Sequence, residues 1–371
     1  MLRIHHMAVF QFKNYTNRSF SFSERIVGIF GKNGVGKTNL LDAIHYLCFT
    51  KSYFTRSDGN NVKQGFTGFR VEGRFELREQ PEKAVCILRE TGRKEFSIND
   101  EAYERFSLHI GRYPCVVIAP DDAELITGDS RERRTFLDEI LSQLDAAYLR
   151  QLIIYTRVLQ QRNSLLKRFA ETNTRDEALL DVLDQQLIQP GEFLFNRRRD
   201  FLLEFLPAVK QLYEEIARIS DSAADKQLPA PEAVNLIYES ELLLTGFPAL
   251  LKANRQKDFL AQRTCSGIHR DDLDIRLGGQ PFKSIASQGQ RKSLLFALKL
   301  AELDRLKKEK GFSPLLLLDD VFEKLDEQRI ENLLRKVCVE NDGQVFITDT
   351  HEDRLLAHLE ALGTGFQLIG L

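Results

Sequence analysis

Hydrophobic and polar positions alternate with two different periodicities along this chain. Near both ends, short alternating or continuous apolar runs such as FRVEGRFEL at 69–77 and PLLLL at 314–318 are typical of strands. Between Ser130 and Arg263 the apolar residues instead recur at helical spacing over long stretches, and strand patterns almost vanish. We therefore predict an α/β domain made of residues 1–128 and 264–371, interrupted by a mainly helical insertion of residues 129–263. The stretch at 221–233, rich in Ala, Pro and polar residues, is the most linker-like.

Composition narrows the class of protein. With 371 residues, 43% of them hydrophobic, the chain can bury a sizeable core. The formal net charge of -2 gives no overall positive field, so any nucleic-acid surface must be a local patch. The 5 cysteines are widely spaced, and no long apolar stretch or signal-like start is found. We expect a cytosolic protein with no membrane partner.

A glycine-rich loop, GKNGVGKT at 31–38, follows a strand-like run and opens a helical pattern. This context and spacing are those of a phosphate-binding P-loop. Lys37 would reach the β- and γ-phosphates of ATP, and the Thr38 hydroxyl would bind Mg²⁺. A plain helix-capping turn is the alternative, but it leaves the Lys-Thr pair unexplained. The predicted nucleotide-binding residues here are Gly31, Lys32, Asn33, Gly34, Val35, Gly36, Lys37 and Thr38.

The run PLLLLDD at 314–320 predicts a parallel strand buried on both faces, with two carboxylates at its ligand-facing end. Paired with a P-loop it resembles a Walker B strand. Asp319 would hold Mg²⁺, and Asp320 would polarise the attacking water. Taken alone, the run could be only a buried strand and a turn. Related sites often have Glu at the second position, so the shorter Asp320 suggests slow hydrolysis.

A second loop, SQGQ at 287–290, directly precedes a long helical pattern and the Walker B strand. The order of P-loop, signature loop and Walker B is typical of ABC-type ATPases, in which the signature loop contacts the nucleotide of the other subunit. Its helix N-terminus would attract the γ-phosphate, which predicts an ATP-dependent homodimer. An ordinary N-cap with a turn glycine is the alternative. The predicted signature residues are Ser287, Gln288, Gly289 and Gln290, and the predicted catalytic residues are Lys37, Asp320 and Ser287.

Three further motifs of ABC-type ATPases are expected: a D-loop, a switch histidine and a Q-loop glutamine. Residues 323–326, EKLD, stand where a D-loop is expected. His351 follows a strand-like run and is either a switch histidine or a surface residue. No glutamine occurs between Ala119 and Asp122, where a Q-loop is expected, so the residue that replaces it is open.

The long helical insertion separates this chain from transporter ATPases and from SMC proteins with extended heptad arms. The chain resembles the RecF family over nearly its whole length. The most specific stretches lie outside generic ATPase motifs: RRTFLDEILSQLD at 133–145 and RVLQQRNSLLK at 157–167. FKNY at 12–15, KSYFTRSD at 51–58 and SGIHRDDL at 266–273 also match. The resemblance implies an ABC/SMC-type P-loop ATPase head with an inserted helical lobe.

The resemblance also implies a function. RecF-like proteins bind ATP and Mg²⁺, dimerise on ATP, and hydrolyse it slowly with stimulation by DNA. They bind single- and double-stranded DNA at junctions and gaps and, with RecR and RecO, promote RecA loading in repair and replication restart. The expected place is the bacterial cytoplasm, at the nucleoid. Two alternatives remain: another ATPase or kinase, such as a transporter subunit, and a catalytically idle scaffold that uses ATP only to hold a dimer.

Basic residues concentrate in the helical insertion. Residues 131–170 contain eight basic against four acidic residues, and NRRRD at 196–200 adds three arginines. A solvated helix face is the alternative to DNA contact. Because no pattern of aromatic residues among these charges suggests base stacking, contact with the sugar-phosphate backbone, independent of sequence, is expected. The candidates are Arg131, Arg133, Arg134, Arg150, Arg157, Arg162, Lys167, Arg197, Arg198 and Arg199.

Lys37→Ala tests the P-loop. One charge-assisted hydrogen bond contributes about 1.5–3 kcal/mol, so the substitution should weaken ATP binding roughly ten- to a hundredfold. Filter binding with labelled ATP measures this, with a thermal melt to show that the variant folds. Unchanged affinity in a folded variant would contradict the assignment.

Overall fold

The computed structural model describes residues 1–172, 174, 176–220, 234–322 and 327–371. The linker-like stretch at 221–233 and the expected D-loop at 323–326 lie outside these residues. Within the described ranges, no helix has both the length and the apolar character needed to cross a membrane.

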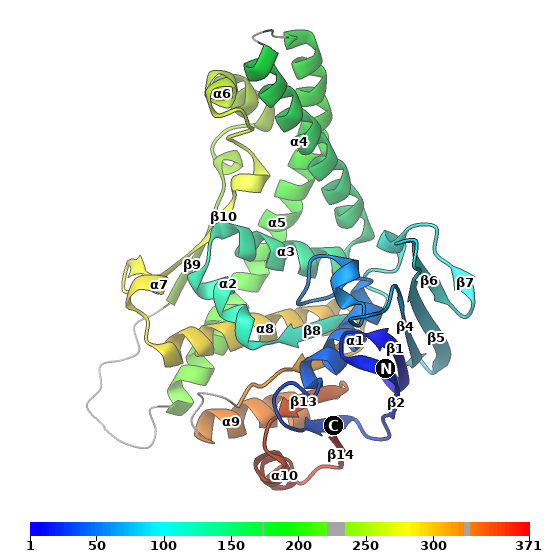
Figure 1. The fold of residues 1–371 in the computed structure, drawn as a ribbon. Helices are drawn as coiled ribbons and strands as arrows, with labels where there is room; N and C mark the ends of the chain where they lie inside the picture. The colour runs from blue at the N-terminus through cyan, green and yellow to red at the C-terminus, as the bar shows by residue number, and fades with distance from the viewer. Residues whose placement is uncertain (173, 175, 221–233, 323–326) are drawn as a thin grey trace. The chain divides into compact units, whose positions relative to one another are not determined.

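A five-stranded parallel sheet joins strands from distant parts of the chain, in the order β14-β3-β13-β12-β8. Figure 1 labels three of these strands, β8, β13 and β14. Strand β12 lies inside the sheet between β13 and β8, and all four of its residues are buried. This confirms the parallel strand that the PLLLL run predicts. The strands are β3 (Ile26–Phe30), β8 (Cys115–Ile118), β12 (Leu315–Leu318), β13 (Val345–Asp349) and β14 (Phe366–Gly370).

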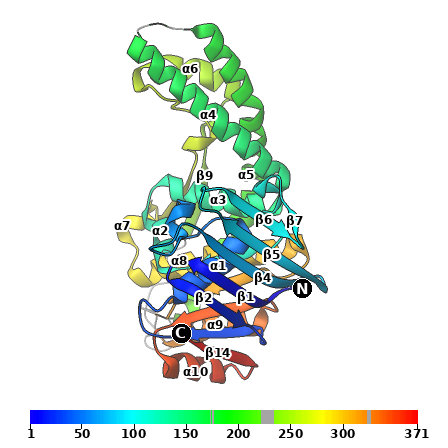
Figure 2. The same ribbon diagram turned by 45° about the vertical axis from the view of Figure 1, so that its right-hand side comes forward.

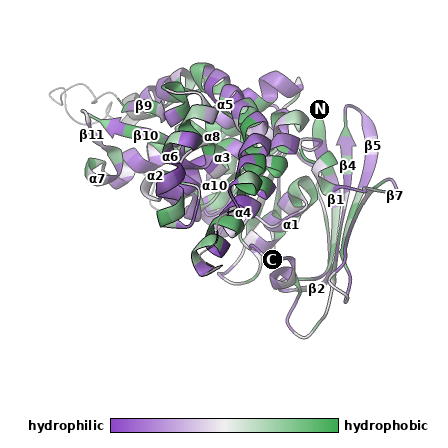
Figure 3. Cartoon of the chain, turned by 90° about the horizontal axis from the view of Figure 1, so that it is seen from above, coloured by the Kyte–Doolittle hydropathy of each residue, from purple (hydrophilic) through white to green (hydrophobic). Residues whose placement is uncertain are grey.

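A second, antiparallel sheet has the order β2-β1-β4-β5-β6-β7, and its strands lie side by side in Figure 2. Buried residues alternate with more exposed ones along β1 and β4, and Figure 3 shows both hydrophobic and hydrophilic residues on these strands. One face therefore packs on a core. The strands are β1 (Leu2–Phe12), β2 (Tyr15–Ser21), β4 (Phe69–Leu77), β5 (Gln80–Leu88), β6 (Lys94–Ile98) and β7 (Glu101–Ala102).

Helix α1 (Lys37–Phe49) packs against strands of both sheets and forms the centre of this core. Nearly all of its residues are buried. The fit against β4 is tight: a Cβ on Gly73 would lie 2.6 Å from Leu47 Cδ1. The position of α1, and of the loop that precedes it, is thus set by packing on two sides. Three other helices accompany it: α8 (Gln288–Lys310), α9 (Glu327–Leu334), which continues into a π-helical turn at Arg335–Glu340, and α10 (Glu352–Ala361).

Contacts divide the chain into two compact units. The first contains Met1–Asp122, the segment that starts at Leu212, and Lys292–Leu371. The second contains Ala123–Gln211 and the described residues that continue to Arg291. Residues 264–291 thus make more of their contacts with the helical part, although their pattern of apolar residues predicts the α/β part. The boundaries predicted at 128/129 and 263/264 stay a prediction.

The second unit combines helices with a small sheet, in the order β11-β10-β9. Strand β9, which the sequence pattern does not reveal, pairs with β10 from Val234 opposite Leu277 to Glu239 opposite Asp272. This pairing draws residues 264–291 into the unit. Its elements are α2 (Glu124–Thr127), α3 (Ser130–Leu144), α4 (Ala146–Thr172), α5 (Glu177–Ser220), β9 (Val234–Glu239), α6 (Phe247–Ala261), β10 (Asp272–Leu277), β11 (Gln280–Pro281) and α7 (Phe282–Ile285).

Arg162 on α4 lies at the centre of a buried ion cluster. Its Nε is 2.6 Å from Asp184 Oδ1 on α5, and its Nη1 is 2.7 Å from Asp258 Oδ2 on α6. Nη1 also donates to Thr264 Oγ1 at 2.8 Å. The side chain is 0% exposed. One guanidinium therefore ties three helices and the following loop together.

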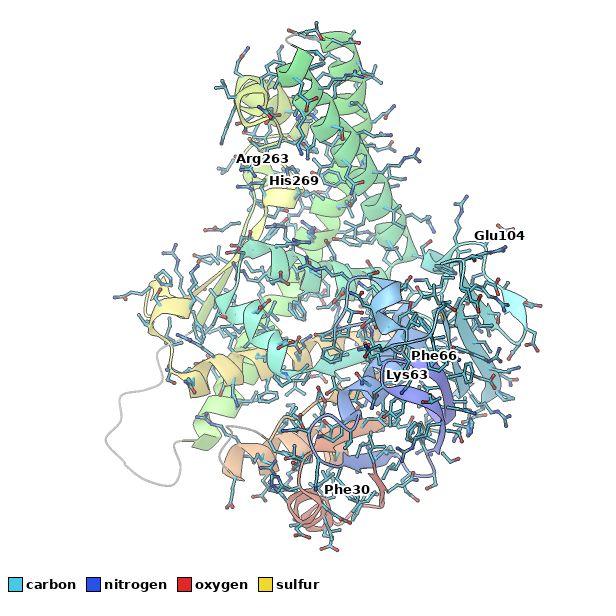
Figure 4. The ribbon with its side chains drawn as sticks, in the orientation of Figure 1. Phe30, Lys63, Phe66, Glu104, Arg263 and His269 are labelled. Carbon is cyan, nitrogen blue, oxygen red and sulfur yellow. The ribbon has the colours of Figure 1, made fainter. Side chains whose placement is uncertain are left out.

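Arg198 on α5 makes a second buried cluster. Its Nη2 is 2.8 Å from Asp138 Oδ1 on α3, and its Nη1 is 3.1 Å from Asp271 Oδ2 and donates to Ile268 O. Nearby, His269 lies on the short helix Ile268–Arg270, where Figure 4 labels it. The His269 ring contacts Tyr155 Oη at 2.8 Å, and burial lowers the pKa of His269 to about 4. The SGIHRDDL segment is thus part of the unit's polar core.

Arg162→Met tests this architecture. The variant keeps most of the side-chain volume but leaves the facing carboxylates buried without their cation, which should lower the free energy of unfolding by about 3–5 kcal/mol. Urea unfolding followed by circular dichroism measures the change. Arg157→Met, at an exposed position of the same helix, is the control and should stay within about 0.5 kcal/mol of the parent. Equal stability of both variants would refute the role of the cluster.

Candidate functional site

The P-loop adopts a backbone that only glycine tolerates well. Gly34 and Gly36 have φ values of 84° and 117°. At Gly36 a Cβ would also lie 2.6 Å from Asn14 Nδ2 and 2.9 Å from Tyr15 Oη. Positive φ values turn successive N–H groups to the inside of the loop, the arrangement that surrounds a phosphate.

The turn between β1 and β2 braces the loop from outside. Tyr15 Oη donates to Gly36 O at 2.9 Å, and Asn14 Nδ2 donates to Val35 O at 2.7 Å. Asn39 on α1 donates in turn to Asn14 Oδ1 at 2.8 Å. Burial raises the pKa of Tyr15 to about 12, so its hydroxyl keeps the proton it donates. Sequence reasoning assigned no role to Asn14 or Tyr15; their only signal is their place in the FKNY stretch.

Lys37 and Thr38 open α1 at the end of this loop. Lys37 is 4% exposed, and its Nζ donates to Gly31 O at 2.9 Å and to Lys32 O at 3.4 Å. The ammonium therefore lies across the loop that would surround the phosphates. Lys37, Thr38 and the three loop glycines thus surround one loop, and their contact with a nucleotide stays a prediction.

The strand β12 presents Asp319 to this same point. Thr38 Oγ1 donates to Asp319 Oδ2 at 2.9 Å, and Thr348 Oγ1 from β13 donates to Oδ1 at 2.8 Å. Asp319 is 4% exposed. Burial raises its pKa, while hydrogen bonds from the two hydroxyls and the charge of Lys37 oppose the rise. Thr348 is a site residue that the sequence analysis missed, because a threonine inside a buried strand has no distinctive pattern.

Asp320 follows with a left-handed backbone, φ 44°, and its N–H donates to Thr348 Oγ1 at 2.9 Å. A non-glycine residue in this region is uncommon and costs backbone strain. Thr348 thus fixes both members of the acidic pair. The structure places Asp320 beside Asp319; its role in activating water stays a prediction.

His351, for which the sequence leaves a switch role and a plain surface position open, follows the end of β13. His351 is the N-cap residue of α10, its side chain is 71% exposed, and its ring contacts Thr350 Oγ1 at 2.8 Å. Next to it, Asp349 accepts from Arg354 Nε at 2.7 Å. Burial works against ionisation of Asp349, but these hydrogen bonds and the charge of Arg354 lower its pKa overall. The switch role of His351 stays a prediction.

The donor set fits a magnesium nucleotide. Thr38 and Asp319 offer hard oxygen ligands, which suit Mg²⁺ bound by one or two protein groups plus phosphates. Lys37 and the loop N–H groups complement phosphate charge. In the described part of the chain, no group of three or more His, Cys, Asp or Glu residues could hold a metal by itself.

The signature loop begins α8 with a reciprocal cap. Gln290 N donates to Ser287 Oγ at 3.2 Å, and Ser287 N donates to Gln290 Oε1 at 2.8 Å. This is a capping box. Ser287 and Gln288 are exposed, and Gly289 and Gln290 are partly exposed. The N-cap interpretation therefore holds, and it is compatible with a phosphate contact because it orders the helix start.

The predicted DNA-contacting arginines divide into two groups. Arg133 is buried and paired with Asp272 at 2.7 Å, and Arg162 and Arg198 form the buried clusters described above. These three are corrected: their guanidinium groups neutralise internal carboxylates and do not reach a surface. Arg134 is half-buried and donates to Asp271 O. The exposed candidates are Arg131, Arg150, Arg157, Lys167, Arg197 and Arg199.

Comparison with known proteins finds consistent likenesses. A family model described as "AAA domain" matches residues 6–340. The DNA replication and repair protein RecF of Flavobacterium johnsoniae is 40% identical over 370 residues, covering 100% of each chain. A solved structure of the recombination mediator protein RecF-ATP in the RecFOR pathway superposes with a TM-score of 0.85 at 28% identity, covering 95% of this chain and 92% of that one. The Smc head domain of Pyrococcus furiosus, at TM-score 0.53 and 17% identity over 96% and 92% of the two chains, shares the fold.

Thr348→Val tests the geometry around Asp319. Loss of the Thr348 hydroxyl removes a donor to the ionised carboxylate, so the pKa of Asp319 should rise further. Mg²⁺-dependent ATP binding needs that carboxylate ionised, and its acid limb should move to higher pH by about one pH unit. Titration of binding affinity between pH 5 and 8 measures the shift. Thr350→Val is the control, because the Thr350 hydroxyl contacts Asp349 and His351. Identical pH profiles for both variants would contradict the assignment.

Proposed function

The chain belongs to the RecF family and has the fold of an ABC/SMC-type ATPase head, and we propose that it is an ATP-dependent, DNA-binding recombination mediator. The observation that carries the proposal is the hydrogen bond from Thr38 to Asp319, which joins the P-loop to the Walker B strand across 281 residues of sequence. This hydrogen bond places the two proposed Mg²⁺ ligands side by side at the end of the P-loop, which supports binding of a phosphate together with its metal ion.

We propose that ATP binding drives formation of a homodimer. In each protomer the P-loop would bind one ATP, and the ordered start of α8 would face the γ-phosphate bound by the partner subunit. The positive end of the helix and its free N–H groups favour that charge. ADP lacks the γ-phosphate, so it would stabilise the dimer less, and the nucleotide state would set the population of dimers.

Hydrolysis would reset the dimer slowly. Mg²⁺, held by Thr38 and Asp319, would supply neutralisation of phosphate charge. Lys37 would bind and orient the phosphates, and Asp320 would accept a proton from the attacking water. The short Asp320 side chain and its fixed, strained backbone support a weak ATPase. The same features favour a second candidate: a scaffold that uses ATP to hold a dimer and hardly turns over.

DNA binding by this protein would be independent of sequence. The exposed arginines and Lys167 of the second unit can neutralise phosphates of single- or double-stranded DNA. Stimulation of the ATPase by DNA, cooperation with RecO and RecR, and loading of RecA at gaps and junctions are the finer parts of the proposal. The support for them is membership of the RecF family and the RecFOR pathway named for the solved relative.

Sedimentation velocity tests the function as a whole. The protein should be monomeric alone and with ADP, dimeric with ATP and Mg²⁺, and should co-sediment with gapped duplex DNA in the ATP state. Lys37→Ala should remain monomeric throughout. A monomer at saturating ATP, with and without DNA, would overturn the proposal. Asp320→Asn separates the two candidates: a variant without turnover that still supports repair in cells favours the scaffold.

A further inference from the structure

A series of buried polar contacts begins on α1, the helix that follows the P-loop. Asp42 on α1 is 0% exposed and accepts hydrogen bonds from Ser52 Oγ at 2.6 Å and from Tyr53 N at 2.7 Å. Lys13 Nζ lies 2.5 Å from the same carboxylate. Asp42 thus fixes the backbone of the loop at Ser52 and Tyr53 against the helix that starts with Lys37 and Thr38.

Tyr53 connects Asp42 to a second group of buried polar residues. Its hydroxyl donates to Asp122, and Lys299 Nζ on α8 lies 3.4 Å from Tyr53 Oη. Lys299 Nζ is also 3.8 Å from Asp122 Oδ2 and 3.9 Å from Glu302 Oε2. The side chains of Lys299 and Asp122 are only 7% and 10% exposed. A buried lysine is therefore held between two carboxylates and a tyrosine.

Asp122 lies in the segment where the sequence has no glutamine of the expected Q-loop. It lies in the short 3-10 helix Pro120–Ala123 that follows β8, and its Oδ2 accepts a hydrogen bond from Ala119 N at 2.8 Å. Because β8 pairs with β12 up to Ile118 opposite Leu318, this carboxylate is anchored to the strand next to the Walker B strand. All residues in this series of polar contacts, from Asp42 to Lys299, belong to the first unit.

Lys299 sits on the helix whose first turn is the signature loop. Helix α8 runs without interruption from Gln288 to Lys310. At about 1.5 Å per residue, roughly 17 Å of helix separate Lys299 from Gln288. A buried ion pair adds little net stability compared with a well-packed apolar side chain, but it can fix one arrangement against others.

We propose that Lys299 is a positioning residue that couples the P-loop helix to the signature helix. Through Tyr53 and Asp122 it holds α8 in the one register that presents Ser287–Gln290 to the nucleotide of the partner subunit. The proposal rests on the proposed ATP-dependent dimer. Lys299 lies outside the predicted nucleotide-binding segments 31–38 and 287–290, so its loss should impair dimerisation and leave ATP binding by the monomer intact.

The experiment compares Lys299→Met with the parent in two assays. ATP affinity is measured by filter binding at protein concentrations too low for dimers, and the ATP-dependent dimer dissociation constant by sedimentation equilibrium. We expect ATP affinity within about twofold of the parent and dimerisation weakened about tenfold or more. Lys308→Met, at an exposed position of the same helix, is the matched control and should change neither constant. Lys299→Arg, which keeps the cation, should restore much of the dimer affinity.

Tyr53→Phe provides an independent arm, because it removes one hydroxyl and retains the ring. It should weaken dimerisation in the same direction, and the double variant with Lys299→Met should lose less than the sum of the two single effects. Dimerisation of both single variants at the parent's affinity, or a loss of ATP affinity equal to the loss of dimer affinity, would overturn the inference. If the parent itself fails to dimerise with ATP, the proposed function fails instead, so the two outcomes are distinguishable. Should Lys299→Met not fold, Tyr53→Phe decides alone.

Discussion

The buried carboxylate of Asp319, which we propose as a ligand of Mg²⁺, lies in surroundings that disfavour its charge. Burial raises its pKa, and the hydroxyls of Thr38 and Thr348 are the donors that oppose this rise. Each donor comes from a different part of the chain: the start of α1 and the strand β13. These two hydrogen bonds therefore join the P-loop, the end of β12 and the end of β13 at one carboxylate.

The antiparallel sheet takes part in the same site, although it contributes no predicted ligand. It packs on one side of α1 while the parallel sheet packs on the other. Its first turn supplies Asn14 and Tyr15, whose side chains hold carbonyl groups of the P-loop. These hydrogen bonds direct carbonyl oxygens outward, so the N–H groups are left to face a phosphate. Core packing and phosphate recognition are thus two results of one arrangement.

Local spacing was sufficient to predict the P-loop, the buried strand β12 and the acidic pair that follows it, because each is specified by neighbouring residues. Contacts between distant residues were not predictable. Thr348 and Tyr15 act on residues 29 and 21 positions away, and their roles depend on the order of strands. Counting charges on helices likewise placed Arg162 on a surface, since nothing near it in sequence indicates that Asp258 neutralises it. Strand β9 was missed because it is defined by pairing with β10.

The capping box at the start of α8 bears on how this loop could distinguish ATP from ADP. Ser287 and Gln290 satisfy each other's backbone N–H groups, so their side chains are already engaged within one protomer. Helix geometry leaves the N–H groups of Gln288 and Gly289 without intrahelical acceptors. Recognition of a γ-phosphate would then come from backbone donors and the helix dipole more than from the Ser287 hydroxyl. In the dimer that we propose, such donors would be ordered before the partner subunit docked, which would lower the entropy cost of docking, and the register of α8 would then decide whether docking succeeds.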